Sequence, residues 1–160
     1  MDVAYINPFI NSVQTVFKDM VHVSCVVGKP FLKREGHRFH VLYSHAATVQ
    51  LSGAVSGMIS LAFAQPVALS LAAAFAGETF ERVNADCSDA LAELVNVVAG
   101  AAKKEMPGGQ VKLSIARLLR TIDVDYPPGV AVIVLPFDTD KGRLVMEVAL
   151  QRAPEPAKKA

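Results

Sequence analysis

The sequence predicts a single domain of the α+β class, in which a mostly antiparallel sheet is covered by long helices. The chain has 160 residues, which is the size of one domain with its own core. Its composition is 52% hydrophobic and 19% charged, as in globular proteins. Segments with apolar residues at helical spacing alternate with short valine-rich runs and tight turns, a pattern that indicates helices and antiparallel strand pairs.

The first quarter of the chain predicts a helix followed by a strand. Residues 7–20 place apolar side chains at helical spacing, and Asn7 before Pro8 is a good start signal for a helix. Residues 21–27 are rich in valine and favour a strand. Residues 28–40 are a polar connection that leaves room for a further strand at its end.

A run without any Lys, Arg, Asp or Glu extends from Phe39 to Gly77. Its length would cross a bilayer, but its Ser and Gly residues and its partial alternation are typical of strands joined by a turn. Pro66 suits the first turn of a helix, and Gly77 suits its C-terminal cap. We therefore expect no membrane span here but three buried elements: strands at 47–53 and 57–64, and a helix at 66–76.

The second half predicts a long helix, a strand and a hairpin. After a loop at 77–86, the helix is expected to be capped at Ser88 or Asp86 and to end before Pro107 and two glycines. The predicted elements are a helix at 87–106, a strand at 111–119, a hairpin of 129–137 and 143–151 joined by Asp-Thr-Asp-Lys-Gly, and a disordered tail at 153–160. The helices 7–20 and 87–106 each carry a central asparagine and run into a strand, which suggests an internal two-fold repeat.

Charge and cysteine content argue against several classes of protein. The net charge is +1, whereas a protein whose main partner is nucleic acid usually has a clear basic excess. Cys25 and Cys87 lie in apolar surroundings without metal-ligand spacing, so we expect two reduced, buried thiols in a cytoplasmic protein, with a disulfide as the alternative. His37 and His40 have no evident third ligand, so no metal site is expected. The N-terminus lacks the pattern of a signal peptide.

The polar residues of the long helix form one narrow strip. At 100° per residue, Asp89, Glu93, Asn96 and Gly100 fall on one side, with Lys103 a turn further on, opposite the apolar face. A solvated surface would explain the carboxylates alone. However, Asn is a poor helix-interior residue, and Gly costs about 1 kcal/mol relative to Ala. We therefore expect a docking surface, on which the glycine lets a partner's backbone come close.

Glu93 and Asn96 stand one helical turn apart and point the same way. A carboxylate can pair with a cation on a partner, and an amide can donate and accept at once, so that it can orient a water molecule. No His or Cys lies within helical reach to act as a base. The pair therefore suits the positioning of water against an electrophile supplied by another molecule, and phosphoryl transfer is helped mainly by such positioning.

The pattern Asp89-x-x-x-Glu93-x-x-Asn96 resembles the signature of the CheC/CheX/FliY phosphatases of bacterial chemotaxis. The resemblance covers most of the chain, in order and spacing, through NPFINSVQTVF, SGAVSGMISLAF, VALSLAAAFAGE, LAELVNVVAGAAKKE and PFDTDKGRLVMEVAL. One motif-bearing helix is similar to CheX rather than to CheC, which usually has two, and Pro8 stands where a second Glu would fall. The resemblance implies a CheC-like domain over residues 1–152.

The resemblance also implies a function: a phosphatase that acts on the phosphorylated response regulator CheY. Glu93 would pair with the regulator's active-site lysine, and Asn96 would orient the water that attacks the aspartyl phosphate. Asp89, Gly100 and Lys103 would contact the partner. The regulator supplies the phosphoaspartate and Mg²⁺, so the chain is expected to need no cofactor of its own. A homodimer is implied as well.

The chain departs from the family at one position, and a second function fits the same helix. Members of the family often carry a proline some twenty residues after the Asn, whereas Ala116 or Leu119 stands there in this chain. The alternative function is a non-catalytic scaffold or switch component that docks a receiver domain through the same helix.

Overall fold

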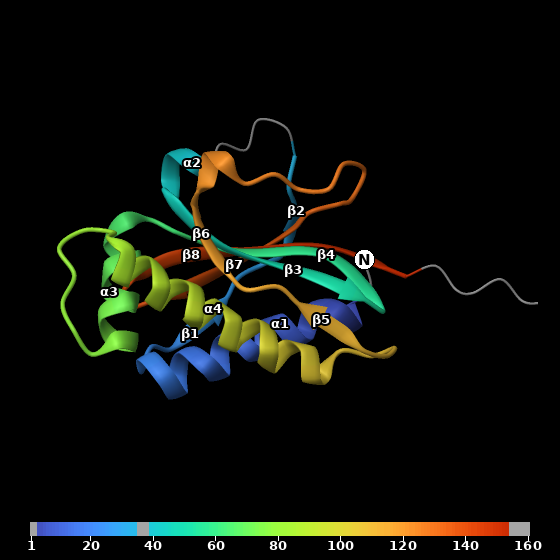
Figure 1. Cartoon of the computed structure of the whole chain (residues 1–160), viewed down its shortest axis with the longest axis horizontal. Coiled ribbons are helices and arrows are strands. Elements are labelled where there is room, and N and C mark those ends of the chain that lie inside the picture. Colours follow the sequence, from blue (N-terminus) through green and yellow to red (C-terminus); the bar gives the residue numbers. More distant parts are fainter. Residues whose placement is uncertain (1–2, 35–38, 154–160) are drawn as a thin grey trace, which may run out of the picture.

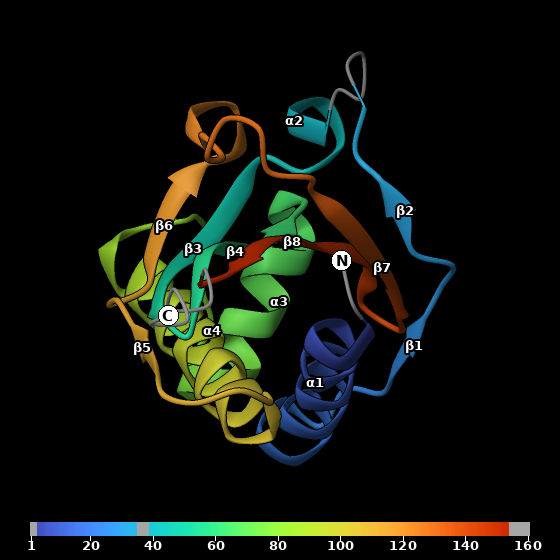
Figure 2. The same ribbon diagram turned by 90° about the vertical axis from the view of Figure 1, so that its right-hand side faces the viewer.

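The computed structural model describes residues 3–34 and 39–153, and its architecture is α+β, as predicted. An antiparallel sheet forms the middle of the molecule. The helices α1 (Val3–Val16), α3 (Gln65–Ala76) and α4 (Ala85–Glu105) lie together on one face of it. The short helix α2 (Phe39–Leu42) lies on the other face (Figure 1, and turned by 90° in Figure 2).

The described strands follow the order β1-β7-β8-β4-β3-β5, with β2 also paired to β7 and β6 also paired to β3. The central strands are long, and the strands at both edges are short. Their bounds are β1 Cys25–Val27, β2 Phe31–Leu32, β3 His45–Gly53, β4 Val55–Phe63, β5 Val111–Leu113, β6 Arg117–Arg120, β7 Ile133–Thr139 and β8 Gly142–Arg152.

The topology has the two-fold arrangement that the sequence suggested. Strands β1 and β2 pair with β7 in the same way as β5 and β6 pair with β3. The hairpin β3–β4 corresponds to the hairpin β7–β8, and β4 and β8 meet at the centre. Helix α1 precedes the first set of strands and α4 precedes the second, so each half is a helix followed by four strands. Helix α3 is an addition to the first half.

The main core lies between the sheet and the helices α1, α3 and α4. It fixes α4 because each fully buried large apolar side chain contributes about 1.5–3 kcal/mol to folding. The largest of these side chains are Phe9, Phe17, Phe63, Phe137, Ile59, Leu61, Leu71, Leu91, Leu94, Leu135, Leu144 and Met146. A smaller cluster on the outer face contains Tyr43, Ala46, Ala62, Val134 and Val145. Strand β8 is therefore buried on both faces from residue 144 to residue 150.

The first helix differs from its prediction at both ends. It begins at Val3, so that Pro8 lies inside it, because Tyr5 and Ile6 extend the apolar face into the core. It then continues as a π-helical turn, η1 (Phe17–Val21), which ends at His22 in a left-handed conformation with φ 56°. As a result, the strand predicted for 21–27 is reduced to Cys25–Val27.

Other boundaries differ for local reasons. The side chain of Asn84 caps α4 by accepting the N–H of Cys87 at 2.9 Å, so the predicted caps at Ser88 and Asp86 were wrong. The connection at 28–40 holds β2 at Phe31–Leu32, and its last two residues begin α2; residues 35–38 lie outside the described residues. The first strand of the last hairpin begins at Ile133 instead of residue 129. Apart from residue 153, the predicted tail lies outside the described residues.

The uncharged run from Phe39 to Gly77 forms α2, the hairpin β3–β4 and α3. Within the described ranges, none of the helices combines the length and the apolar character that a membrane crossing requires.

Candidate functional site

Helix α4 presents one face to the core and one to solvent. Its buried residues are Cys87, Ala90, Leu91, Leu94, Val95, Val98, Ala99 and Ala102. On the other side, the side chains of Asp89, Glu93 and Lys103 are exposed, while Asn96 and Gly100 are half-buried. The strip therefore runs along the outer side of α4, with its carboxylates in solvent.

The charges on α4 have different structural explanations. Asp86 lies in the first turn of the helix and Lys103 lies in its last turn, where each charge interacts favourably with the helix dipole. Asp89 and Glu93 lie beyond the first turn, where the dipole gives them no such role. Among residues 3–34 and 39–153, the carboxylates of Asp89 and Glu93 make no hydrogen bond or ion pair. They are therefore available to a partner.

A groove of about 590 Å³ lies beside the N-terminal half of this strip. Its lining comes from the end of η1, the end of α3, the loop that follows α3, and α4. It combines apolar side chains with carboxylates: Met20, Phe75, Ala76, Phe80 and Ala90, with Glu78, Asp86, Asp89 and Glu93. Sequence reasoning did not find this groove, because Met20 is distant along the chain from the rest of its lining and the loop after α3 has to fold back against α4.

The amide of Asn96 is hydrogen-bonded to the backbone that follows β5. Its Nδ2 donates to the carbonyl oxygen of Ser114 at 3.2 Å, and its Oδ1 accepts the N–H of Ala116 at 2.8 Å. The helical pattern alone did not predict these two contacts. A primary amide has two N–H donors and two acceptor lone pairs, so one donor and one lone pair of Asn96 remain outside these bonds.

The segment that holds Asn96 is a β-bulge. Leu51 pairs with Leu113, and Thr48 pairs with Arg117. Residues 49–50 of β3 therefore lie opposite three residues, 114–116, of the segment between β5 and β6. The predicted continuous strand at 111–119 is therefore divided into β5 and β6. Bulges of this kind often lie beside functional sites, where they redirect the chain. Ala116 uses its N–H to hold Asn96, a bond that a proline at this position could not make.

Gly100 has no structural need to be glycine. A Cβ added at this position would meet nothing within 4 Å, and the residue has an ordinary helical φ. Since alanine is the better helix former, the fold of the single chain gives no reason for a glycine here.

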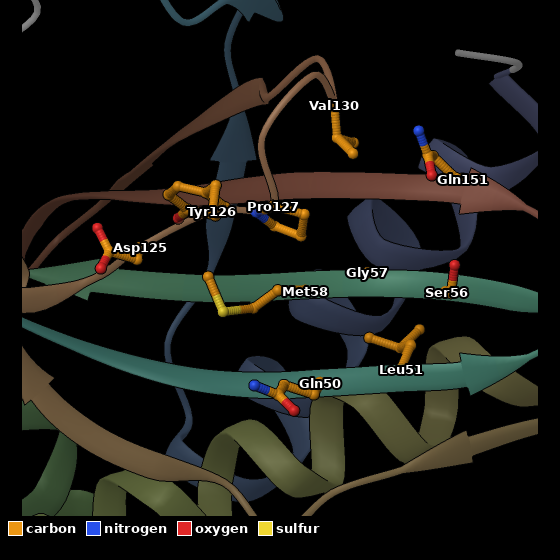
Figure 3. Close-up of a pocket in the computed structure, with 10 residues that line it drawn as sticks. All are labelled: Gln50, Leu51, Ser56, Gly57, Met58, Asp125, Tyr126, Pro127, Val130 and Gln151. Carbon is orange, nitrogen blue, oxygen red and sulfur yellow. The ribbon is translucent and has the colours of Figure 1, made fainter.

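A second hollow, of about 460 Å³, lies on the outer face of the sheet, away from α4 (Figure 3). The side chains of Gln50, Met58, Ser56 and Gln151 come from the strands, and the segment at 125–130 covers one side. Tyr126, which also lines the hollow, is hydrogen-bonded to Ser60, and its pKa is raised above the usual value, mainly by burial and also by Glu147. The hollow thus offers two amides, two hydroxyls and the carboxylate of Asp125, and the described residues that line it include no histidine, cysteine or cationic side chain.

In the described part of the chain, no three His, Cys, Asp or Glu side chains are grouped so that they could hold a metal ion. Cys25 and Cys87 are buried free thiols.

A model of the family described as chemotaxis phosphatase CheX matches residues 45–138, which is more than half of the chain. This range includes α4, the groove residues that follow α3, and the bulge that holds Asn96. A comparison with curated proteins gave no significant match.

Several solved structures have the same fold. A CheC-like superfamily protein from Shewanella sp. PV-4 is 23% identical, with a TM-score of 0.81 over 94% of this chain and 99% of that one. The chemotaxis protein CheX from Vibrio vulnificus is 21% identical, with a TM-score of 0.78 over 92% and 99%. A structure of a CheX–CheY–BeF₃–Mg²⁺ complex from Borrelia burgdorferi is 21% identical, with a TM-score of 0.77 over 92% and 98%.

Proposed function

Because the chain belongs to the CheX family of chemotaxis phosphatases, we propose that it accelerates hydrolysis of the aspartyl phosphate on a CheY-type receiver domain. The observation that carries this proposal is the outer strip of α4. It holds an unpaired, exposed carboxylate at Glu93 and, one turn on, the oriented amide of Asn96. The Borrelia burgdorferi relative, which was crystallised with CheY, BeF₃ and Mg²⁺, supports a receiver domain as the partner.

Glu93 is the anchoring residue in this proposal. Its carboxylate is exposed, and no cation of the described chain neutralises it. It can therefore accept an ammonium group from the partner, which we assign to the active-site lysine of the receiver. Asp89 adds negative charge one turn before Glu93, and the groove beside both carboxylates offers apolar contacts. Gly100 and Lys103 extend the contact toward the C-terminus of α4.

Asn96 is the water-positioning residue. One N–H of Nδ2 and one lone pair of Oδ1 remain outside its backbone bonds; they point in different directions, and either can hold and orient a water molecule by one hydrogen bond. A water held in line with the phosphorus atom needs little further help, because phosphoryl transfer depends mainly on positioning and on charge stabilisation. The receiver supplies the phosphoryl group and Mg²⁺ in this scheme, so that two molecules complete one active centre.

The test is the loss of phosphate from a purified CheY-type receiver, phosphorylated by a small-molecule donor in the presence of Mg²⁺. The wild-type chain is expected to accelerate the loss. Asn96→Ala is expected to abolish the acceleration, and Glu93→Ala is expected to raise KM for the phosphorylated receiver. Glu105→Gln is the matched control, since Glu105 is an exposed carboxylate on the same helix but outside the strip. Binding of a beryllofluoride-loaded receiver without any acceleration would favour the non-catalytic scaffold.

Folding must be checked in the same experiment. Asn96→Ala loses two hydrogen bonds to the bulge, and the expected cost is about 1–2 kcal/mol of unfolding free energy. Glu93→Ala loses no internal bond and is expected to keep the wild-type stability. Activities are therefore compared at a temperature at which circular dichroism shows each variant folded.

Two further properties belong to the proposal. A homodimer is expected from the family resemblance, and sedimentation equilibrium on the purified chain measures it directly. A cytoplasmic location is expected for a partner of a receiver domain, and it agrees with two free thiols.

A further inference from the structure

The side chain of Ser114 takes the place of a backbone group in the sheet. The register that pairs Leu51 with Leu113 sets Gln50 opposite Ser114. In a regular antiparallel pair of this kind the two residues exchange both N–H···O=C bonds. Here the N–H of Ser114 donates to the carbonyl oxygen of Gln50 at 2.9 Å, but the N–H of Gln50 donates to the Oγ of Ser114, also at 2.9 Å.

Because the hydroxyl of Ser114 takes this hydrogen bond, the carbonyl of Ser114 is not needed for sheet pairing. The hydroxyl accepts the bond that the carbonyl would otherwise take, and it donates its own hydrogen to the carbonyl oxygen of Ile115 at 3.2 Å. The released carbonyl accepts the Nδ2–H of Asn96 instead. The extra residue of the bulge then brings the N–H of Ala116 to the Oδ1 of Asn96.

From these contacts we propose that Ser114 is a positioning residue: its hydroxyl keeps the bulge open, and the bulge fixes the plane of the Asn96 amide. The inference rests on the proposed function, in which that amide orients the attacking water. A side chain free to rotate about χ2 would present its donor and acceptor in many directions. With Nδ2 bound to the carbonyl of Ser114 and Oδ1 bound to the N–H of Ala116, the amide plane is fixed, and the remaining N–H and lone pair each keep one direction.

A fixed Asn96 amide matters because the reaction depends on where the attacking water is held. A water molecule attacks productively only within a narrow range of positions, and a displacement of about 1 Å can cost on the order of 100-fold in rate. Ser114 is itself exposed and lies on the sheet rather than on the helix. Its effect should therefore appear in the turnover step more than in the binding of the receiver.

The test compares Ser114→Thr with Ser114→Val. The two side chains have the same shape, and only threonine keeps the hydroxyl. Ser114 is exposed, so the added methyl groups have room in both variants. With a phosphorylated CheY-type receiver and Mg²⁺, we expect Ser114→Thr to keep kcat within about twofold of the wild-type value. Ser114→Val is expected to lower kcat by about tenfold or more with KM nearly unchanged. Ser52→Ala, an exposed serine of the same sheet, is the control and should change neither constant.

A spectroscopic measurement accompanies the kinetics. In ¹⁵N-labelled protein, the side-chain N–H signals of Asn96 report on its bond to Ser114 without any receiver present. These signals are expected to keep their positions in Ser114→Thr and to shift, with faster exchange of the bonded hydrogen, in Ser114→Val. Unchanged Asn96 signals in Ser114→Val would overturn the inference, and so would wild-type kcat or an equal loss in both variants.

The outcomes separate this inference from the proposed function. If the wild-type chain does not accelerate hydrolysis, or if Asn96→Ala keeps full activity, the proposed function is wrong. If acceleration depends on Asn96 while Ser114→Val retains the wild-type kcat, the function stands and the role of Ser114 is wrong.

Discussion

The ammonium group of Lys33 lies 2.7 Å from the Oε2 of Glu147, a carboxylate that is only 2% exposed on the outer face of the central strand β8. The ammonium group also lies over two aromatic rings, at 5.2 Å from the centroid of Phe39 and 5.0 Å from that of Tyr126. Lys33 therefore connects the segment after β2 with the start of α2 and with the segment before β7.

Lys33→Met is expected to lower the free energy of unfolding by about 3 kcal/mol. The substitution keeps most of the apolar volume but leaves the carboxylate of Glu147 buried without its cation, and an uncompensated buried charge is strongly destabilising. Urea unfolding followed by circular dichroism measures the loss. Arg143→Met is the control, because its ion pair with Asp138 lies in solvent and should contribute little. Equal losses in the two variants would contradict the special role of the buried pair.

Gly100→Ala is expected to raise the stability of the free protein and to weaken its action on the receiver. The added methyl group meets no atom within 4 Å, and alanine is favoured over glycine in a helix by about 1 kcal/mol. If the partner's backbone approaches this position, the same methyl group obstructs it, and kcat/KM should fall. Thermal unfolding and the dephosphorylation assay measure the two effects. A more stable variant with unchanged kcat/KM would show that no partner touches Gly100.

Docking through carboxylates is expected to depend on salt. Exposed charges are screened over about 10 Å at 0.1 M ionic strength and over about 3 Å at 1 M. KM for the phosphorylated receiver should therefore rise with salt, while kcat changes little. In Glu93→Gln the rise should be smaller, because one attractive charge has already been removed. A salt response of KM that is identical in the wild-type chain and the variant would exclude Glu93 from the contact.

The two thiols are expected to be unreactive in the folded protein at neutral pH. Burial, with a smaller contribution from Asp140, raises the pKa of Cys25 from its ordinary 9.0 to about 12, and burial also raises the pKa of Cys87. Only the thiolate is the nucleophile, so its population stays negligible until the pH approaches those raised values. A colorimetric thiol reagent at pH 8 should count two cysteines in denaturant and react far more slowly with the native chain. Rapid native reaction would contradict this burial.

Periodicity predicted the long elements well. The apolar spacing of α4 identified both its core face and its outer strip, since a helix that covers a sheet must bury one stripe. The hairpins β3–β4 and β7–β8 followed from alternation and from turn residues. The start of α1 was missed because a proline is favoured in a first turn, whereas here tertiary packing of Tyr5 and Ile6 extends the helix before Pro8.

The surroundings of Asn96 could not be predicted in the same way. Its two partners lie 18 and 20 residues further along the chain, and they reach it only because the register of β5 and β6 on β3 differs by one residue. The run 111–119 has the composition of an ordinary strand, and a bulge depends on the pairing strand rather than on local preference. The only hint was an asparagine in the middle of a helix, which is a poor position for that residue unless its amide has a partner.

The two-fold plan of the sheet has an evolutionary consequence. Each helix packs on the sheet through its buried face only. The residues on its outer face can therefore change without loss of the architecture. On α1, Pro8 stands at the place that Glu93 occupies on α4, but it is buried and its carbonyl oxygen accepts the hydroxyl of Ser12, so α1 offers no carboxylate there. The same two-fold scaffold can thus carry two working surfaces, one or none.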